Sequence, residues 1–260
     1  MPDRPIQHAA DGSTKTIERE WVPEVPVALE YNGLSYAVMM ASPHDLEDFA
    51  RGFALTEGLA RSPDDITDIA VVEVEHGWIA RAQLTGLGIE KLTERVRTRV
   101  AESSCGLCGI ENLEAVSTPL PRVATHEALE PQAIFAALGK LRDHQPLTTA
   151  TGAAHAAAFC APDGAILQAR EDVGRHNAMD KLIGALALAG QGASDGFILS
   201  SARCSYEIVE KAVRAGATRL VTISLPTSMA VERARAAGLS LWCLARDDSV
   251  LCVNNGAVPK

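Results

Sequence analysis

Two cysteines that stand two residues apart are the residues of this chain best suited to covalent chemistry. Cys105 and Cys108 lie in the segment Ser103 to Gly109, with a glycine directly after each cysteine. Apolar residues then recur at helical spacing until Pro119. We expect the pair to lie on a flexible turn that leads into a short helix, whose N-terminus would lower the pKa of a thiol. Cys105, the outer cysteine, is the candidate nucleophile, and Cys108 is the candidate to resolve or assist it.

A structural zinc site is the main alternative for this pair. Such a site needs four ligands, usually from a second Cys or His pair at similar spacing. The sequence has no second pair of this kind. Four further cysteines stand singly in apolar runs, where cysteine is usually a small buried hydrophobic residue: Cys160, Cys204, Cys243 and Cys252. A thioredoxin-like site would follow the first strand of a small βαβ unit, and this pair comes much later. We therefore favour reactive thiol chemistry and predict no metal site.

Composition sets the broad class of protein. The chain has 260 residues, a formal net charge of −9 and 47% hydrophobic residues, which is an ordinary soluble composition. The negative charge argues against a nucleic-acid partner. No apolar run reaches membrane-spanning length, and the N-terminus lacks the apolar core of a secretory signal. Six cysteines in a chain of this length are not a disulfide framework. We expect a cytoplasmic protein that contacts neither membranes nor nucleic acid.

The first half of the sequence predicts a flexible tail over residues 1–24 and a smaller α+β N-terminal domain over 25–121, which ends in the cysteine loop. Asn32-Gly33 is a strong signal for a hairpin turn. Ser42 and Pro43 fit the N-cap and first position of a helix that Gly58 would end. The expected elements are a hairpin over 25–41, a helix over 42–58, strands over 66–74 and 78–84, and a helix over 89–100.

The second half predicts an α/β domain over residues 122–260, because short apolar strands alternate with amphipathic helices. This alternation is typical of a parallel or mixed sheet that is covered by helices. The expected helices begin at Pro131 and at 179, 207 and 228, and the expected strands cover 155–160, 165–169, 197–199, 220–223, 239–244 and 250–253.

Polar residues follow three of these strands, where ligands of parallel sheets usually bind. The three segments are 200–203, 224–228 and 246–249, and two of them precede helix N-termini, which attract phosphate. Arg203 and Arg246 can add bidentate phosphate contacts, and Asp247 or Asp248 can accept hydrogen bonds from a guanine edge. Taken singly, the Ser and Thr residues are more simply helix caps. Together they predict a phosphate-bearing ligand, although neither of the two familiar Gly-rich phosphate loops is present.

The densest polar stretch of the chain, residues 170–181, has two interpretations. It can be a buried ion-pair network that holds the two halves together, and we favour this for Asp172, Asp180 and Lys181. It can also belong to a binding site, because His155 and His176 have the side chains of a ligand or a proton carrier. For these two histidines the sequence leaves both interpretations open.

Several of these motifs occur in one order that resembles the formate dehydrogenase accessory sulfurtransferase family, FdhD. They are the cysteine loop, Thr151-Gly152 with His155, residues 170–181, Ser201-Ala202-Arg203, and Ser224-Leu225-Pro226-Thr227. The resemblance covers residues 25 to 253. Four positions depart from the family: Leu244 stands where an aromatic residue is common, Ser249 where a second arginine is common, and Ala153 and Ala202 where glycine is usual.

The resemblance implies a cytidine-deaminase-like mixed-sheet fold for the C-terminal domain and a homodimer. It implies that Cys105 carries a persulfide, with sulfur moving from a cysteine desulfurase to the bis-molybdopterin guanine dinucleotide form of the molybdenum cofactor, which formate dehydrogenase requires. GDP would be a mimic of part of that cofactor. The alternative is a cofactor-binding chaperone for formate dehydrogenase without covalent sulfur transfer. The implied cofactor-binding residues are Leu244, Ala245, Arg246, Asp247, Asp248 and Ser249, to which we add Arg203 and Thr227.

Overall fold

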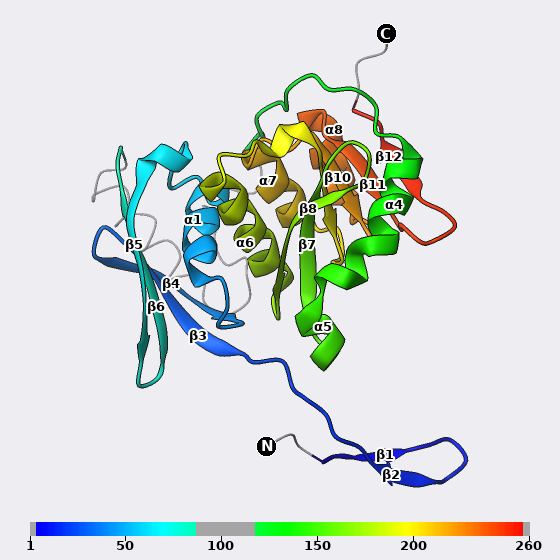
Figure 1. Ribbon diagram of the computed structural model, residues 1–260. Helices are drawn as coiled ribbons and strands as arrows, with labels where there is room; N and C mark the ends of the chain where they lie inside the picture. Colours follow the sequence, from blue (N-terminus) through cyan, green and yellow to red (C-terminus); the bar gives the residue numbers. More distant parts are fainter. Residues whose placement is uncertain (1–3, 87–117, 257–260) are drawn as a thin grey trace.

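A computed structural model describes residues 4–86 and 118–256 (Figure 1). Cys105, Cys108 and the helix expected over 89–100 lie outside the described residues. Within them the chain forms three sheets, with two, four and six strands. No helix in this part of the chain is both long and apolar enough to span a bilayer.

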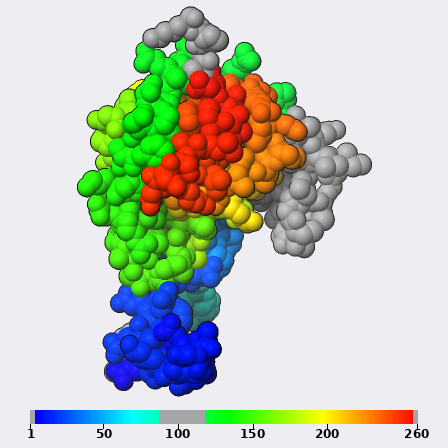
Figure 2. All heavy atoms as spheres, turned by 90° about the vertical axis from the view of Figure 1, so that its right-hand side faces the viewer, coloured from blue at the N-terminus to red at the C-terminus, as the bar shows by residue number. Residues whose placement is uncertain are grey.

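The N-terminal segment, expected as a flexible tail, contains a short antiparallel hairpin of β1 (Ile6–His8) and β2 (Thr14–Thr16). All six residues of these strands are exposed, and the hairpin protrudes from the rest of the molecule (Figures 1 and 2). The predicted flexibility of residues 1–24 remains a prediction.

The four-stranded sheet contains the expected hairpin. Its order is β4-β3-β6-β5, in which β3 and β6 are parallel and the other pairs are antiparallel. Asn32 and Gly33 form the turn of the hairpin with φ angles of 51° and 78°, the left-handed conformations that favour Asn and Gly. The Asn32 amide also bonds across the sheet to both backbone groups of Leu84, at 2.6 and 3.1 Å. The strands are β3 (Val25–Tyr31), β4 (Leu34–Ala41), β5 (Ile66–Val74) and β6 (Gly77–Leu84).

One helix, α1 (Leu46–Thr56), packs on this sheet, and its start corrects the sequence prediction. Ser42 does not cap it. The backbone N–H of Ser42 donates to Asp172 Oδ2 at 2.9 Å, and Ser42 Oγ accepts from the N–H of Val173. These bonds hold Ser42 to a distant strand, so the helix begins only after Asp45, which has a φ of 54°. The predicted end is confirmed, because Gly58 follows the helix with a φ of 67°.

The six-stranded sheet has the order β12-β11-β10-β9-β7-β8. Strands β9, β10 and β11 are parallel, and the remaining pairs are antiparallel, so the predicted mixed α/β sheet is confirmed. The likeness to cytidine deaminases and the division at residue 121 remain predictions. The strands are β7 (His155–Cys160), β8 (Ile166–Asp172), β9 (Phe197–Ser200), β10 (Arg219–Thr222), β11 (Ser240–Cys243) and β12 (Leu251–Asn254).

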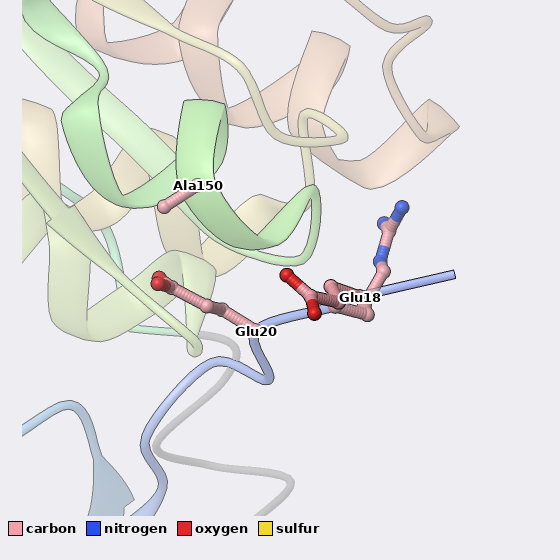
Figure 3. Close-up of a pocket in the computed structure, with 4 residues that line it drawn as sticks. Glu18, Glu20 and Ala150 are labelled. Atoms are coloured by element: carbon pink, nitrogen blue, oxygen red, sulfur yellow. The ribbon is translucent and has the colours of Figure 1, made fainter. Parts of the chain in front are cut away.

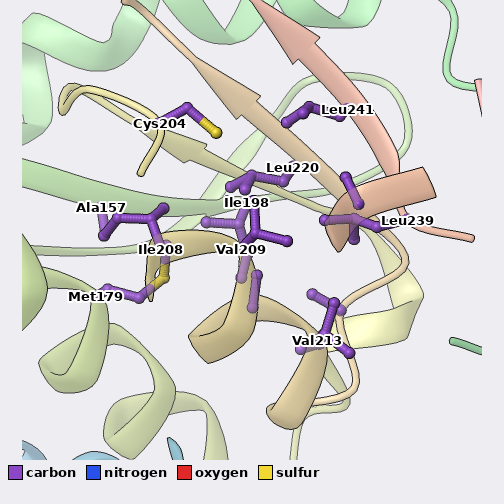
Figure 4. Packing of buried hydrophobic residues seen from close by; sticks show 14 of the residues in the cluster. Ala157, Met179, Ile198, Cys204, Ile208, Val209, Val213, Leu220, Leu239 and Leu241 are labelled. Carbon is purple, nitrogen blue, oxygen red and sulfur yellow. The ribbon is translucent and has the colours of Figure 1, made fainter. Parts of the chain in front are cut away.

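Helices cover both faces of the six-stranded sheet. The helices α6 (Arg175–Leu188), α7 (Tyr206–Arg214) and α8 (Ser228–Ala237) surround one core, which includes Ile198, Ile208 and Leu220 (Figure 4). On the opposite face, α4 (Pro131–Leu141) packs Ile134 against Phe197 and Trp242. The sequence did not predict the six-residue helix α5 (Pro146–Thr151), and it placed the start of α6 four residues too late. Single 3₁₀ turns occur at Pro63–Asp65, Arg142–His144 and Ala193–Asp195.

The two larger sheets are joined through α1 and α6, which cross with their backbones in contact. A Cβ atom on Gly52 would lie 1.7 Å from the carbonyl oxygen of Asp180, and one on Gly184 would lie 1.9 Å from that of Asp48. No side chain fits in such a space, so both positions require glycine. The layers therefore run from the small sheet through α1 and α6 to the large sheet (Figure 1).

Two buried ion pairs reinforce this junction and confirm the structural interpretation of Asp172, Asp180 and Lys181. In the first, Lys181 Nζ lies 2.6 Å from Asp172 Oδ2 and also donates to the carbonyl of Ser42 at 2.9 Å. In the second, Lys211 Nζ lies 2.9 Å from Asp180 Oδ1. The first pair is tied to Ser42 and the second to Thr56, both more than 120 residues away in the sequence, so the role of these pairs is to hold the two halves of the fold together.

Candidate functional site

The carboxyl ends of β9, β10 and β11 meet at one edge of the six-stranded sheet. Their parallel registers place Ser200 beside Thr222, and Val221 beside Trp242. Backbone bonds continue beyond the strands, since the N–H of Ala245 donates to the carbonyl of Thr222 at 3.2 Å. The prediction that three polar strand ends share one edge is therefore confirmed. The ligand-binding roles of individual residues remain predictions.

Arg246 is the most promising ligand-binding residue of the turn after β11. Its side chain is exposed, and its Nη1 atom contacts the carbonyl oxygens of Ile223 and Ala245. These contacts fix the guanidinium at the end of the sheet. A guanidinium has five N–H donors, so two carbonyl contacts leave others for a phosphate.

The remaining residues of this turn differ in accessibility. Ala245 is 2% exposed and contributes to the core rather than to a surface. Leu244 has a left-handed φ of 50° and is 37% exposed. The N–H of Arg246 donates to the carbonyl of Ser249 at 2.8 Å, which closes the turn. Three polar residues of the turn are exposed: Asp247, Asp248 and Ser249.

Thr227 has the structural role that the sequence offered as the simpler interpretation. It is the N-cap of α8, and its Oγ1 atom accepts from the N–H of Ala230 at 3.2 Å. Its own N–H donates to the carbonyl of Cys204 at 3.0 Å, which ties the loop after β10 to the loop after β9. Thr227 is exposed at the edge where the three parallel strands end, and it also connects the loops that follow β9 and β10.

A second polar group lies beside this edge, around the start of β7. His155 opens β7 opposite Asp172, the last residue of β8. Arg175 and His176 begin α6 three residues later. On the other side of β7, Ser201 exchanges two hydrogen bonds with Ala156: its N–H donates to the Ala156 carbonyl, and its Oγ accepts from the Ala156 N–H.

Arg203 therefore belongs to the same neighbourhood as His155, because it follows Ser201 by two residues. The sequence left the two histidines undecided and gave Arg175 no separate role. One feature of the sequence could have indicated a role for Arg175. The segment Gly174-Arg175-His176 comes directly after a strand, which places charged residues at a helix N-terminus.

The charges around His155 affect its protonation. Burial lowers the pKa of His155, and Arg175, Arg203 and His176 lower it further, against an opposing effect of Asp172. The Nε2 atom of His176 lies 3.0 Å from Glu207 Oε2. The hydrogen bond from His176 is the main reason that the pKa of Glu207 is lowered. The group is thus rich in positive charge, with Glu207 as a partner for His176.

A surface pocket lies elsewhere, where the N-terminal segment passes α5 (Figure 3). It is lined by Glu18, Arg19, Glu20 and Ala150, and Arg19 is held by a 2.9 Å hydrogen bond from its Nη2 atom to the carbonyl of Thr151. Two carboxylates are unsuited to a phosphate ligand, because like charges repel. We therefore place the candidate site at the strand ends.

The four described cysteines are poorly placed for sulfur chemistry with an external partner. Burial raises the pKa of Cys160 to about 12, and the side chain is fully buried. Cys204 and Cys243 are also fully buried, and a hydrogen bond shared with Cys243, followed by burial, raises the pKa of Cys204. Cys252 is exposed, but burial of its thiol raises its pKa. Among the described residues no group of three His, Cys, Asp or Glu side chains is arranged to hold a metal ion.

These environments predict how the thiols react with iodoacetamide, which requires an accessible thiolate. In a Cys105→Ala/Cys108→Ala variant under native conditions, we expect Cys252 alone to be alkylated, and slowly. Peptide mass spectrometry after short incubation measures this. Rapid modification of Cys160, Cys204 or Cys243 would contradict the described burial, and denatured protein provides the control in which all four thiols react.

The fold places the chain in the class of α/β proteins with a helix-covered mixed sheet, in which ligands usually bind at the carboxyl ends of the parallel strands. Comparison with known proteins narrows this class. The model of the FdhD/NarQ family matches residues 22–256. The chain belongs to this family.

Two relatives and one solved structure illustrate the similarity. A protein of Chromobacterium violaceum named sulfur carrier protein FdhD is 45% identical over 249 residues, which cover 95% of this chain and 92% of that protein. One of the same name from Burkholderia mallei is 43% identical over 246 residues, covering 92% and 88%. The crystal structure of a putative formate dehydrogenase accessory protein from Desulfotalea psychrophila has a TM-score of 0.76, 20% identity and coverage of 98% and 96%, and it supports the fold alone.

Proposed function

We propose that this protein is a sulfur carrier for formate dehydrogenase. It accepts a sulfur atom from a cysteine desulfurase on Cys105 and delivers it to the molybdenum cofactor in its bis-molybdopterin guanine dinucleotide form. The observation that carries the sulfur-carrier role is the 45% identity, over 95% of the chain, to a protein named as a sulfur carrier. The identity of the sulfur donor, the identity of the cofactor and the persulfide on Cys105 are further parts of the proposal.

The surroundings of the other cysteines support Cys105 and Cys108 as the reactive pair. Three of the four described cysteines are fully buried, and the fourth has a raised pKa. A carrier has to present its thiol to two partners in turn, which a buried cysteine cannot do. By sequence, Cys105 and Cys108 combine thiol chemistry with glycine-rich surroundings.

The first step is a thiol–persulfide exchange. The Cys105 thiolate attacks the terminal sulfur of the desulfurase persulfide, a new S–S bond forms on Cys105, and the desulfurase cysteine leaves as a thiolate. In the second step, the Cys108 thiolate attacks the Cys105 sulfur, and the carried sulfur leaves as sulfide toward the cofactor. The two thiols supply the two electrons and end as a disulfide, which a dithiol reductant opens again.

The strand-end edge supports a nucleotide-bearing cargo. Arg203 and Arg246 are exposed and suited to the phosphates, and Asp247 or Asp248 can accept hydrogen bonds from the guanine edge. Thr227 and the backbone of Leu244, Ala245 and Ser249 would frame this position. We further propose that the protein works in the cytoplasm as a homodimer, so that cargo can be passed between soluble partners.

The test is intact mass after incubation with a cysteine desulfurase and cysteine. We expect the wild-type mass to rise by one sulfur atom, and a reductant to remove the addition. Cys105→Ala should show no addition, whereas the matched variant Cys252→Ala should show it in full. An unchanged wild-type mass, together with binding of the cofactor, would contradict sulfur transfer and favour a cofactor-binding chaperone.

A further inference from the structure

Four side chains with cationic character meet near the start of α6: His155, Arg175, His176 and Arg203. They come from three places in the chain, namely the first residue of β7, the first turn of α6, and the loop after β9. Strand pairing and the two Ser201–Ala156 hydrogen bonds bring these places together. This cation cluster stands out on a chain whose net charge is −9.

The charges of the cation cluster are only partly compensated. Glu207 Oε2 lies 3.0 Å from His176, and Asp172 is already paired with Lys181 at 2.6 Å. Among the described residues, neither Arg175 nor Arg203 forms an ion pair with a carboxylate. The Nε atom of Arg175 is buried and has no hydrogen-bond partner in the described part of the chain. A buried donor in this state costs free energy unless a ligand accepts from it.

The backbone adds donors at the same place. Gly174 precedes the 14-residue helix α6 and has no side chain of its own to cap the first turn. The Asp172 carboxylate accepts from the N–H of Gly174 at 2.7 Å, just before the first N–H groups of the helix. The Asn177 amide, which stands at a position suited to capping, instead donates to the carbonyl of Met40 and to Asp172 Oδ1. Free N–H groups and the helix dipole attract an anion to such an end.

We propose that His155, Arg175, His176 and Arg203, together with the N-terminus of α6, form an oxyanion site that takes a phosphate or diphosphate group. Guanidinium forks and helix N–H groups suit the several oxygens of a tetrahedral oxyanion. The site shares Arg203 with the strand-end edge but is separate from the turn that carries Arg246, because β10 lies between β9 and β11 in the sheet. Two neighbouring strand spacings separate these two strands by about 10 Å.

The inference does not rest on sulfur transfer, and titration calorimetry with inorganic diphosphate at constant ionic strength tests it. Wild type should bind, and Arg175→Gln should lose at least about tenfold in affinity, because a charge-assisted bidentate contact disappears. Arg235→Gln, which removes the same charge from an exposed position on α8, should bind like wild type. No binding by wild type, or equal affinity of Arg175→Gln and wild type, would overturn the proposal.

A second variant protects the test against a folding defect. Arg203 is exposed, so Arg203→Gln should leave the fold intact and still weaken diphosphate binding. Arg175→Lys keeps the charge but loses the fork, and it should bind with intermediate affinity. Wild-type affinity in Arg203→Gln would remove this residue from the site and contradict the proposal as stated.

The protonation of His155 supplies an independent readout. An oxyanion opposes the effect of burial and of the neighbouring cations, so it should raise the pKa of His155. Sulfate, which stays ionised throughout, should therefore bind more tightly at about pH 6 than at about pH 8. His155→Gln should flatten this dependence, although Glu207 and His176 still face the site. Equal slopes in wild type and His155→Gln would exclude His155 from it.

The source of the phosphate is separated by comparing diphosphate, GDP and guanosine. If the nucleotide places its phosphates in the oxyanion site, Arg175→Gln and Arg246→Gln should both lower the affinity for GDP. Guanosine, which has no phosphate, should then bind poorly to every variant. If the site serves free oxyanions, Arg175→Gln should weaken diphosphate but leave GDP unchanged. Both results support the oxyanion site. Cys105→Ala should bind diphosphate and GDP like wild type. This result separates the test of the oxyanion site from the test of sulfur transfer.

Discussion

Replacing Cys105 by alanine is expected to reduce formate dehydrogenase activation to the background of cells that lack the gene for this protein. A persulfide carrier has no substitute for its sulfur, since neither alanine nor serine can hold a transferable sulfur atom. The variant should remain folded, because the substitution removes a single sulfur atom from a residue that is followed by glycine in the sequence, which is a small change in volume. The measurement is formate dehydrogenase activity in the deletion strain, with each variant supplied at equal abundance.

Two further variants sharpen this experiment. Cys108→Ala should retain part of the activity, because a thiol of the external dithiol reductant can replace Cys108 in attacking the Cys105 sulfur, whereas nothing replaces Cys105 as the carrier. Cys252→Ala is the matched control, since it removes an exposed thiol from β12, and it should activate like wild type. Full activation by Cys105→Ala would end the sulfur-transfer proposal. Equal and complete loss from Cys105→Ala and Cys108→Ala would mean that the two thiols act as one unit.

The sequence predicted those parts of the fold that depend on neighbouring residues. The hairpin at Asn32-Gly33 follows from two left-handed conformations that the local sequence favours. The alternation after Pro131 follows from the spacing of apolar residues, which reports a strand or a helix from a short window. The convergence of three polar strand ends follows in turn, because parallel strands point in one direction.

Long-range contacts explain what the sequence did not predict. The start of α1 moved to Leu46 because Ser42 bonds to Asp172, which is 130 residues away. The helix α5 has six residues, too few to establish a period. The cation cluster requires the pairing of β7 with β8 and β9, so the proximity of His155 to Arg175 and Arg203 is a property of the sheet and not of any one segment.

The buried pair of Asp180 and Lys211 gives the largest stability effect that we expect from a single substitution. Lys211 Nζ lies 2.9 and 3.0 Å from the two carboxylate oxygens of Asp180. It also lies 3.0 Å from Glu57 Oε1 and from Thr56 Oγ1. Burial lowers the pKa of Lys211, but Asp180 and Glu57 outweigh it, so the pKa lies above its ordinary value. The pair joins the end of α1 to α6 and α7.

Lys211→Met should destabilise the protein by about 3–5 kcal/mol, because it leaves the Asp180 carboxylate buried without its partner. Thr56 Oγ1 still donates to Asp180 at 2.6 Å, but a neutral donor cannot replace the ammonium. Urea unfolding monitored by circular dichroism measures the loss. Leu188→Met on α6 is the control, because that side chain is 65% exposed and should change stability little.

The loss should depend on pH with a defined sign. Burial raises the pKa of Asp180, and without Lys211 nothing of comparable strength opposes this effect. The folded variant then binds a proton more readily than the unfolded chain, so its stability falls as pH rises above the ordinary aspartate pKa. Lowering the pH toward the ordinary aspartate pKa should therefore reduce the difference in the free energy of unfolding between Lys211→Met and wild type.

The double variant Lys211→Met/Asp180→Leu distinguishes two possible roles of this ion pair. The pair either adds net stability to the fold or only compensates the cost of burying its own two charges. When both charges are removed and their volume is kept, replacement of a buried pair is often neutral or stabilising. We therefore expect the double variant to be more stable than Lys211→Met and to lose the pH dependence described above. If it were as unstable as Lys211→Met at every pH, the cost would arise from packing at the junction of α1, α6 and α7, and the unpaired Asp180 charge would not be its cause.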